Sequence, residues 1–237
     1  MRTSLHLSRA RLKASRGEAL SAIAPLLLPA DGSKQAGHAH RLVWLLFQDS
    51  PDATRDFLWR DEGSGKFMIL SQRPPTDKHH LFELDSKPFE PALAAGDRLS
   101  FVLRANPVIA RKGALTKSEH DSRQRGKRVD VVMDALKGVP ANERSAVRDK
   151  IASEAGAAWL VRQGDTSGFK LVRHPQIDGY DQVAIERGKK GRPAGFSVLN
   201  FAGELDITDP AAFIARLAKG FGSAKAFGNG MMLIRRA

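Results

Sequence analysis

The stretch from residue 199 to residue 234 carries the strongest local pattern in the chain. Every second position from 199 to 207 shares one face of a predicted β-strand, and these positions hold Leu199, Phe201, Gly203, Leu205 and Ile207. Asp209 is suited to cap a following helix with Pro210 at its first position, because proline pre-sets the backbone dihedral there. That helix ends at Gly220, and a final strand follows at 231–234. With inserted helices upstream, the second half predicts a ferredoxin-like unit.

The first half of the chain predicts a second unit of the same kind. A dense apolar run from 40 to 47 is too continuous for an edge strand and predicts a buried helix that begins near His38. The predicted strands are residues 3–7, 52–60, 66–72 and 98–106. Because this order is close to a split βαβ motif, the expected fold class is α+β, with two tandem ferredoxin-like (RRM-like) βαββαβ domains. The expected domains are 1–109 and 110–237.

The charge of the chain indicates a polyanionic partner. It has 38 Lys+Arg against 26 Asp+Glu, a formal net charge of +12 over 237 residues. This excess favours nucleic acid over a membrane surface, because no basic amphipathic helix with aromatic anchors is visible. With no Cys, the chain cannot form disulfides, thiolate nucleophiles or cysteine-ligated zinc sites. The absence of a ~20-residue apolar span and of a signal-peptide pattern leads us to expect a cytoplasmic protein.

A glycine-rich run between residues 220 and 230 is a candidate phosphate-binding loop. Its spacing fits neither a P-loop nor a dinucleotide-binding turn. Glycine can expose backbone N–H groups to a phosphodiester, and Gly222, Ser223 and Lys225 are the candidate contacts in this run. A flexible turn is the alternative.

Two basic segments are further candidates for contact with nucleic acid. One predicts a hairpin tip and holds Arg187, Lys189, Lys190 and Arg192. The other begins at residue 110 and ends with Lys127 and Arg128. For both segments a solvated loop or linker is the alternative interpretation.

His40 is the candidate catalytic residue. In the first turn of the predicted helix, the dipole would disfavour imidazolium and keep the ring neutral near pH 7. Arg41 follows it as a fixed cation suited to a phosphate oxygen. A satisfied core histidine is the alternative. We expect neither a metal nor another cofactor, because the chain shows no cluster of carboxylates or suitably spaced histidines.

Several short motifs occur in an order that resembles one known family. They are Arg55-Asp56-Phe57-Leu58-Trp59, Lys87-Pro88-Phe89, Leu103-Arg104-Ala105-Asn106-Pro107, Gly126-Lys127-Arg128-Val129, Phe201-Ala202-Gly203-Glu204-Leu205 and the glycine-rich run. From about residue 38 to 237 the chain resembles the CRISPR RNA-processing endoribonuclease of the type I-E Cascade complex, the CasE/Cse3 family. Against that family, residues 12–36 and 130–155 look like insertions.

The resemblance implies cleavage at the base of the CRISPR repeat hairpin by a Cascade subunit that stays bound to its product. The expected partners are pre-crRNA, crRNA and other Cascade subunits, with the backbone subunit as a neighbour. The family has a histidine on the first helix seven residues before a phenylalanine, which matches His40 and Phe47. Family members often have a tyrosine three residues before the histidine. Gly37 stands there in this chain, which leaves the second acid/base group open.

The chemistry that the resemblance implies needs no metal, because RNA carries its own nucleophile in the 2′-OH. His40 can act as general base on that hydroxyl or as general acid for the leaving 5′-oxygen, a role worth roughly 10²–10⁴ in rate. Arg41 and Lys225 are candidates to stabilise charge in the transition state. The expected products are a 2′,3′-cyclic phosphate and a 5′-OH. The alternative is a non-catalytic CRISPR repeat RNA-binding subunit of the same fold.

Overall fold

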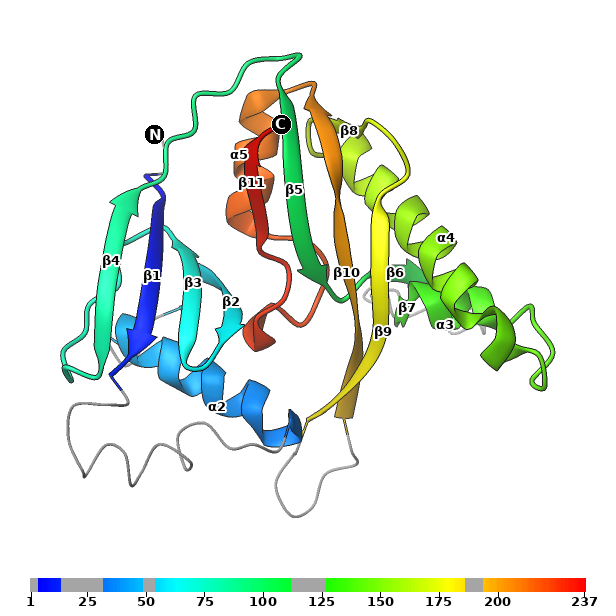
Figure 1. The fold of residues 1–237 in the computed structure, drawn as a ribbon, viewed down its shortest axis with the longest axis horizontal. Helices are drawn as coiled ribbons and strands as arrows, with labels where there is room; N and C mark the ends of the chain where they lie inside the picture. The colour runs from blue at the N-terminus through cyan, green and yellow to red at the C-terminus, as the bar shows by residue number, and fades with distance from the viewer. Residues whose placement is uncertain (1–3, 14–31, 49–53, 112–126, 186–193) are drawn as a thin grey trace, which may run out of the picture.

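The computed structural model describes residues 4–13, 32–48, 54–111, 127–185 and 194–237. Two antiparallel sheets stand beside one another; α2 (Gly32–Trp44) covers one face of the first, and α4 (Arg144–Asp165) and α5 (Pro210–Lys219) cover one face of the second (Figure 1). None of the helices in these ranges is long and apolar enough to cross a membrane.

The first sheet has the strand order of a ferredoxin-like unit. Its elements are β1 (His6–Leu12), α2 (Gly32–Trp44), the 3-10 turn η1 (Leu45–Phe47), β2 (Phe57–Gly63), β3 (Lys66–Ser71) and β4 (Phe82–Pro88). The order β2-β3-β1-β4, antiparallel throughout, places the first and third strands at the centre. The apolar face of α2 packs with Trp59, Phe67 and Ile69 in one buried cluster on one side of this sheet.

The second sheet repeats that order. Its elements are β5 (Arg98–Ala105), α4 (Arg144–Asp165), β8 (Phe169–Leu171), β9 (Gln176–Ile185), β10 (Ala194–Ile207), α5 (Pro210–Lys219) and β11 (Met232–Arg236). The order is β11-β5-β10-β8, with β9 also paired to β10, and β5, β9 and β10 are longer than the strands of the first sheet. As predicted, Asp209 caps α5, and its Oδ1 accepts from the N–H of Ala212 at 3.0 Å. The fold is therefore two tandem ferredoxin-like units, as expected.

One strand belongs to a different sheet from the one predicted. We expected residues 98–106 to complete the first sheet, but β5 pairs with β10 and β11 in the second. Its apolar residues Leu99, Phe101 and Leu103 pack in the second core, and alternation alone does not say which core a strand faces. β4, which none of the predicted strands covers, occupies the edge instead. Sheet membership thus changes between β4 and β5, and the domain division at residue 109 stays a prediction.

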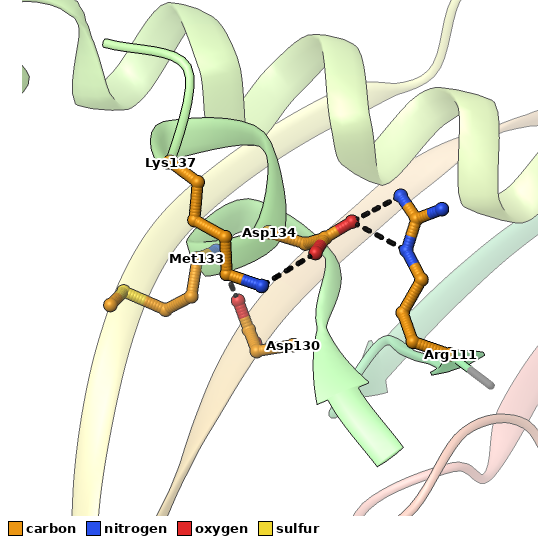
Figure 2. A network of polar contacts seen from close by, with 5 residues as sticks. All are labelled: Arg111, Asp130, Met133, Asp134 and Lys137. Atoms are coloured by element: carbon orange, nitrogen blue, oxygen red, sulfur yellow. Dashed lines mark hydrogen bonds and ion pairs between the residues drawn. The ribbon is translucent and has the colours of Figure 1, made fainter. Parts of the chain in front are cut away.

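A small polar network fixes the connection between β5 and α4, within the second unit. This connection contains β6 (Val108–Arg111), β7 (Lys127–Asp130) and α3 (Val131–Leu136). Figure 2 shows Asp134 accepting hydrogen bonds from Arg111 and Lys137, and Asp130 capping α3 through the backbone N–H of Met133 at 2.8 Å.

Asp130 also ties this connection to the second sheet. Its carboxylate accepts from the hydroxyl of Tyr180 at 2.9 Å and from that of Ser197. The same network fixes the end of β5, because the Asn106 side chain donates to the carbonyl of Ser197 at 2.8 Å.

Candidate functional site

His40 lies well inside α2 and not in its first turn. The helix begins at Gly32, because residues 32–37 continue it upstream of the apolar run. The prediction that a helix N-terminus holds this ring neutral is therefore wrong. The partly buried imidazole lies 5.9 Å from the ring of Trp44 and 6.3 Å from that of Phe227, measured between centroids.

Burial and two arginines favour the neutral form of His40. The pKa of this ring is lowered first by desolvation and then by the positive charges of Arg55 and Arg41. Nδ1 is buried and has no hydrogen-bond partner. Burial and neighbouring charge therefore favour the neutral ring, where the sequence led us to expect the helix dipole to do so.

His40 and Arg41 both line an open groove along α2. The groove has a volume of about 430 Å³, and its other lining residues include His38, Trp44 and Gln48. Arg41 is exposed, so a phosphate in this groove can contact its guanidinium. His40 is therefore accessible to a ligand, unlike a fully packed core histidine.

The glycine-rich run folds back on β5 and β2 and not outward as a free loop. Gly222 has φ +72°, and a Cβ there would lie 2.4 Å from the carbonyl oxygen of Asn106. The N–H of Ser223 donates to that same oxygen at 3.0 Å. Five backbone N–H groups of the run have protein acceptors, namely those of Gly220, Phe221, Ser223, Phe227 and Gly230. These groups are committed within the protein, contrary to the expectation that glycine would expose them, and RNA contact by Gly222 and Ser223 stays a prediction.

The run brings Lys225 toward α2. Lys225 begins the 3-10 turn η2 (Lys225–Phe227), which contacts α2 directly. Its Nζ donates to the carbonyl of Lys219 at 2.8 Å. Desolvation, followed by the charges of Arg216, Arg55, Lys219 and Arg128, lowers the pKa of Lys225 to about 8.

Two residues that the sequence did not single out belong to this site. Arg55 lowers the pKa of both His40 and Lys225, so its charge reaches both groups. Phe227 places an aromatic ring beside His40. Arg55 begins one of the motifs quoted for the family resemblance, and that position was its only signal in the sequence.

The remaining predicted contacts have a less complete structural description. Arg187, Lys189, Lys190 and Arg192 lie outside the described residues, between β9 and β10, whose residues Ile185 and Ala194 pair. Lys127 belongs to β7, and its side chain also lies outside the description. Arg128 is exposed and contributes to the lowered pKa of Lys225, which places it on the same side of the protein. Over the described ranges, no group of three His, Asp or Glu side chains could hold a metal ion.

Comparison with known proteins gives one consistent family. A family model described as CRISPR associated protein matches residues 5–236. The CRISPR-associated endoribonuclease Cse3 of Thermus thermophilus is 35% identical over 157 residues, which are 62% of this chain and 60% of that protein, less than two thirds of its length. The Cascade subunit CasE of Escherichia coli K12 is 30% identical over 207 residues, 84% of this chain and 92% of that protein. A solved CRISPR endoribonuclease Cse3 bound to a 19-nucleotide RNA matches 98% of both chains with a TM-score of 0.62 and 25% identity.

Proposed function

Because the chain belongs to the CRISPR-associated family of type I-E CasE/Cse3 proteins, we propose that it is an endoribonuclease that cuts CRISPR repeat RNA hairpins to mature crRNA. The names of its relatives and the RNA-bound structure support the reaction class. The observation that carries the proposal is the neutral, groove-facing imidazole of His40 with the cationic turn of Lys225 in contact with its helix.

His40 is the general base of the proposed reaction. Its lowered pKa keeps the ring unprotonated at neutral pH, so the ring can accept the proton of the 2′-OH. The 2′-oxygen then attacks the adjacent phosphorus, and the bond from phosphorus to the 5′-oxygen breaks. The RNA must be held with these two oxygens in line, because positioning supplies much of the rate enhancement.

Arg41 and Lys225 stabilise the extra negative charge on the phosphorus oxygens. Arg41 is always cationic and lies in the same groove as His40. Lys225 is mostly protonated at pH 7, because its pKa is about 8. That pKa also makes Lys225 a competent acid, and we assign to it the proton that the leaving 5′-oxygen requires. The products are a 2′,3′-cyclic phosphate and a 5′-OH, and no metal takes part in these steps.

The position where the resemblance leads us to expect a tyrosine as the second acid/base group is occupied by a glycine in this chain. Gly37 has no side chain, and Tyr180, the only tyrosine in the sequence, donates its hydroxyl to Asp130. Burial, the charge of Asp130 and the hydrogen bond to it raise the pKa of Tyr180 to about 12, which suits a structural hydroxyl and not a proton donor. The acid therefore comes from the glycine-rich run.

RNA binding uses further basic residues. Arg128 lies near Lys225, and the residues between β9 and β10 provide Arg187, Lys189, Lys190 and Arg192. A thin basic hairpin is suited to the deep major groove of an A-form stem, which a helix cannot enter. The protein keeps its cut hairpin and joins the other Cascade subunits, and its cytoplasmic location stays a prediction.

The test uses a repeat RNA hairpin and the purified protein. We expect cleavage in EDTA, no cleavage when the scissile nucleotide is 2′-deoxy, and a cyclic phosphate identified by mass spectrometry. His40→Ala should lower the single-turnover rate by about 10²–10⁴ with little change in hairpin affinity. Cleavage that EDTA abolishes would contradict the mechanism.

Gly37 supports the second candidate, a non-catalytic RNA-binding subunit of the same fold. Without the tyrosine side chain, hairpin binding can persist while the chemistry is lost. Tight binding of the repeat hairpin with no product after prolonged incubation of the wild-type protein would establish this alternative.

A further inference from the structure

A second pocket lies between the two units, beside the glycine-rich run. It has a volume of about 480 Å³, and its lining includes Arg60 of β2, Arg104 of β5, Asn200 and Phe196 of β10, and Phe227 of η2. Arg60 and Arg104 come from different sheets and meet only because the units pack together. None of the proposed catalytic steps uses these two arginines.

The two arginines have unused capacity for an anion. Nη1 of Arg60 is buried without a hydrogen-bond partner, while Nη1 of Arg104 donates to Oδ1 of Asn200 at 3.5 Å. Burial, and next the charge of Arg104, lower the pKa of Arg60. Two partly buried like charges close together destabilise the free protein, and a bound phosphate would relieve this repulsion by accepting hydrogen bonds from both.

The nearby carboxylates neutralise this pair only in part. Asp61 lines the pocket but is exposed, and it accepts from the N–H of Gly63 at 2.8 Å. The charge of Glu62 raises the pKa of Arg60, but Glu62 is also 3.8 Å from Arg9, and the pKa of Arg60 stays lowered. Asp181 also lines the pocket but is exposed. Its carboxylate is a suitable acceptor for a base amino group.

Aromatic rings connect this pocket to the catalytic groove. The rings of Phe196 and Phe227 stack with centroids 5.5 Å apart, and Phe227 lies 6.3 Å from the ring of His40. Phe196 is only partly buried, which leaves ring surface for a nucleobase. Stacking on aromatic side chains is a general way to hold an unpaired base of single-stranded RNA.

We propose that this pocket binds one unpaired nucleotide next to the scissile phosphate, with its own phosphate on Arg60 and Arg104 and its base against Phe196. The identity of the RNA rests on the proposed function, whereas the anion and base contacts rest on the pocket itself. A nucleotide held here is separated from His40 by the ring of Phe227, so it fixes the position of the RNA backbone at the cleavage site.

The experiment compares hairpins made uncleavable by a 2′-deoxy substitution at the cut. The trimmed hairpin ends at the scissile phosphate. The flanked hairpins carry unpaired nucleotides on the 5′ side or on the 3′ side of the hairpin. The wild-type protein should bind one of the flanked hairpins about tenfold or more tighter than the trimmed one. In Arg60→Gln and Arg104→Gln this advantage should fall to about twofold or less. Each lost phosphate contact should also reduce the slope of log affinity against log salt by about 0.7.

Two further variants separate a local effect from loss of charge or of fold. Arg148→Gln removes the same charge from the exposed surface of α4, on the other face of the second sheet, and should keep the full flank advantage. Arg60→Lys keeps the charge but loses the bidentate hydrogen-bonding geometry of the guanidinium, and it should retain part of the flank advantage.

Equal binding of trimmed and flanked hairpins by the wild-type protein would overturn the proposal, as would an unchanged flank advantage in both glutamine variants. Failure to bind any hairpin would contradict the proposed function instead. A four-nucleotide single strand then decides the pocket, because its affinity falls in Arg60→Gln only if the pocket binds it.

Discussion

Replacement of Gly222 by alanine tests whether the catalytic lysine depends on the tight contact between the glycine-rich run and β5. At Gly222 the backbone has φ +72°, and an added Cβ would lie 2.4 Å from the carbonyl oxygen of Asn106. That atom belongs to the backbone and cannot swing aside. The loop must therefore move, and the hydrogen bond from the N–H of Ser223 to the same oxygen is lost.

The expected cost of Gly222→Ala has three parts. A left-handed backbone at a non-glycine residue costs about 1–2 kcal/mol. The lost hydrogen bond adds about 0.5–1.5 kcal/mol, and relief of the overlap adds about 1–3 kcal/mol. The free energy of unfolding should thus fall by about 2.5–6.5 kcal/mol. The shifted loop carries Lys225 away from His40, so cleavage should also slow.

Gly63→Ala is the matched control. Gly63 has φ +82°, but an added Cβ there meets no atom within 4 Å. Its cost should be the backbone part alone, about 1–2 kcal/mol, with cleavage unchanged. Denaturant unfolding and single-turnover cleavage of a repeat hairpin are measured on both variants. Equal destabilisation of the two variants, or an unchanged cleavage rate in Gly222→Ala, would refute the reasoning.

The remaining predictions concern charge and the missing tyrosine. Arg55→Gln removes a positive neighbour that lowers the pKa of both the catalytic imidazole and the loop lysine, so both limbs of the pH–rate profile should move to higher pH; two unmoved limbs would contradict this. Gly37→Tyr should fold, because a Cβ there meets nothing within 4 Å, and it should cleave faster than the wild-type protein because it restores the missing tyrosine. Gly37→Ala should only stabilise the helix, by about 1 kcal/mol, and leave the cleavage rate unchanged. Absorbance at 295 nm reports on Tyr180 alone and should show ionisation near pH 12, shifted down in Asp130→Asn; an unshifted titration would remove Asp130 as a cause.

The fold was largely predictable because its local signals agree with its long-range pairing. The predicted helix begins and ends in the structure where the sequence indicates, with Asp209 as its cap, Pro210 at its first position and Gly220 after its last. β5 was assigned to the wrong unit because an alternating strand shows that one face is buried but not which core buries it. The start of α2 was missed because residues 32–37 lack an apolar stripe, although the helix includes them.

The candidate site was predictable in its residues but not in its electrostatics. His40, Arg41 and Lys225 stand out by residue type and family motif, and the structure brings them to one side of the molecule. The effect of Arg55 on both titrating groups depends on packing between distant segments, which no local pattern encodes. The same is true of the Arg60 and Arg104 pocket, because each arginine alone resembles an ordinary strand residue.

The strand β2 holds both halves of the proposed centre. Trp59 packs in the cluster beneath α2, and its indole N–H donates to the carbonyl of Ala226 at 3.3 Å, beside Lys225. During translation, a ribosome makes the imidazole early and the lysine almost two hundred residues later. A nascent chain therefore carries the base and Arg41 without the lysine that serves as the acid, and it should spare nearby transcripts until the second unit has emerged and docked onto this tryptophan.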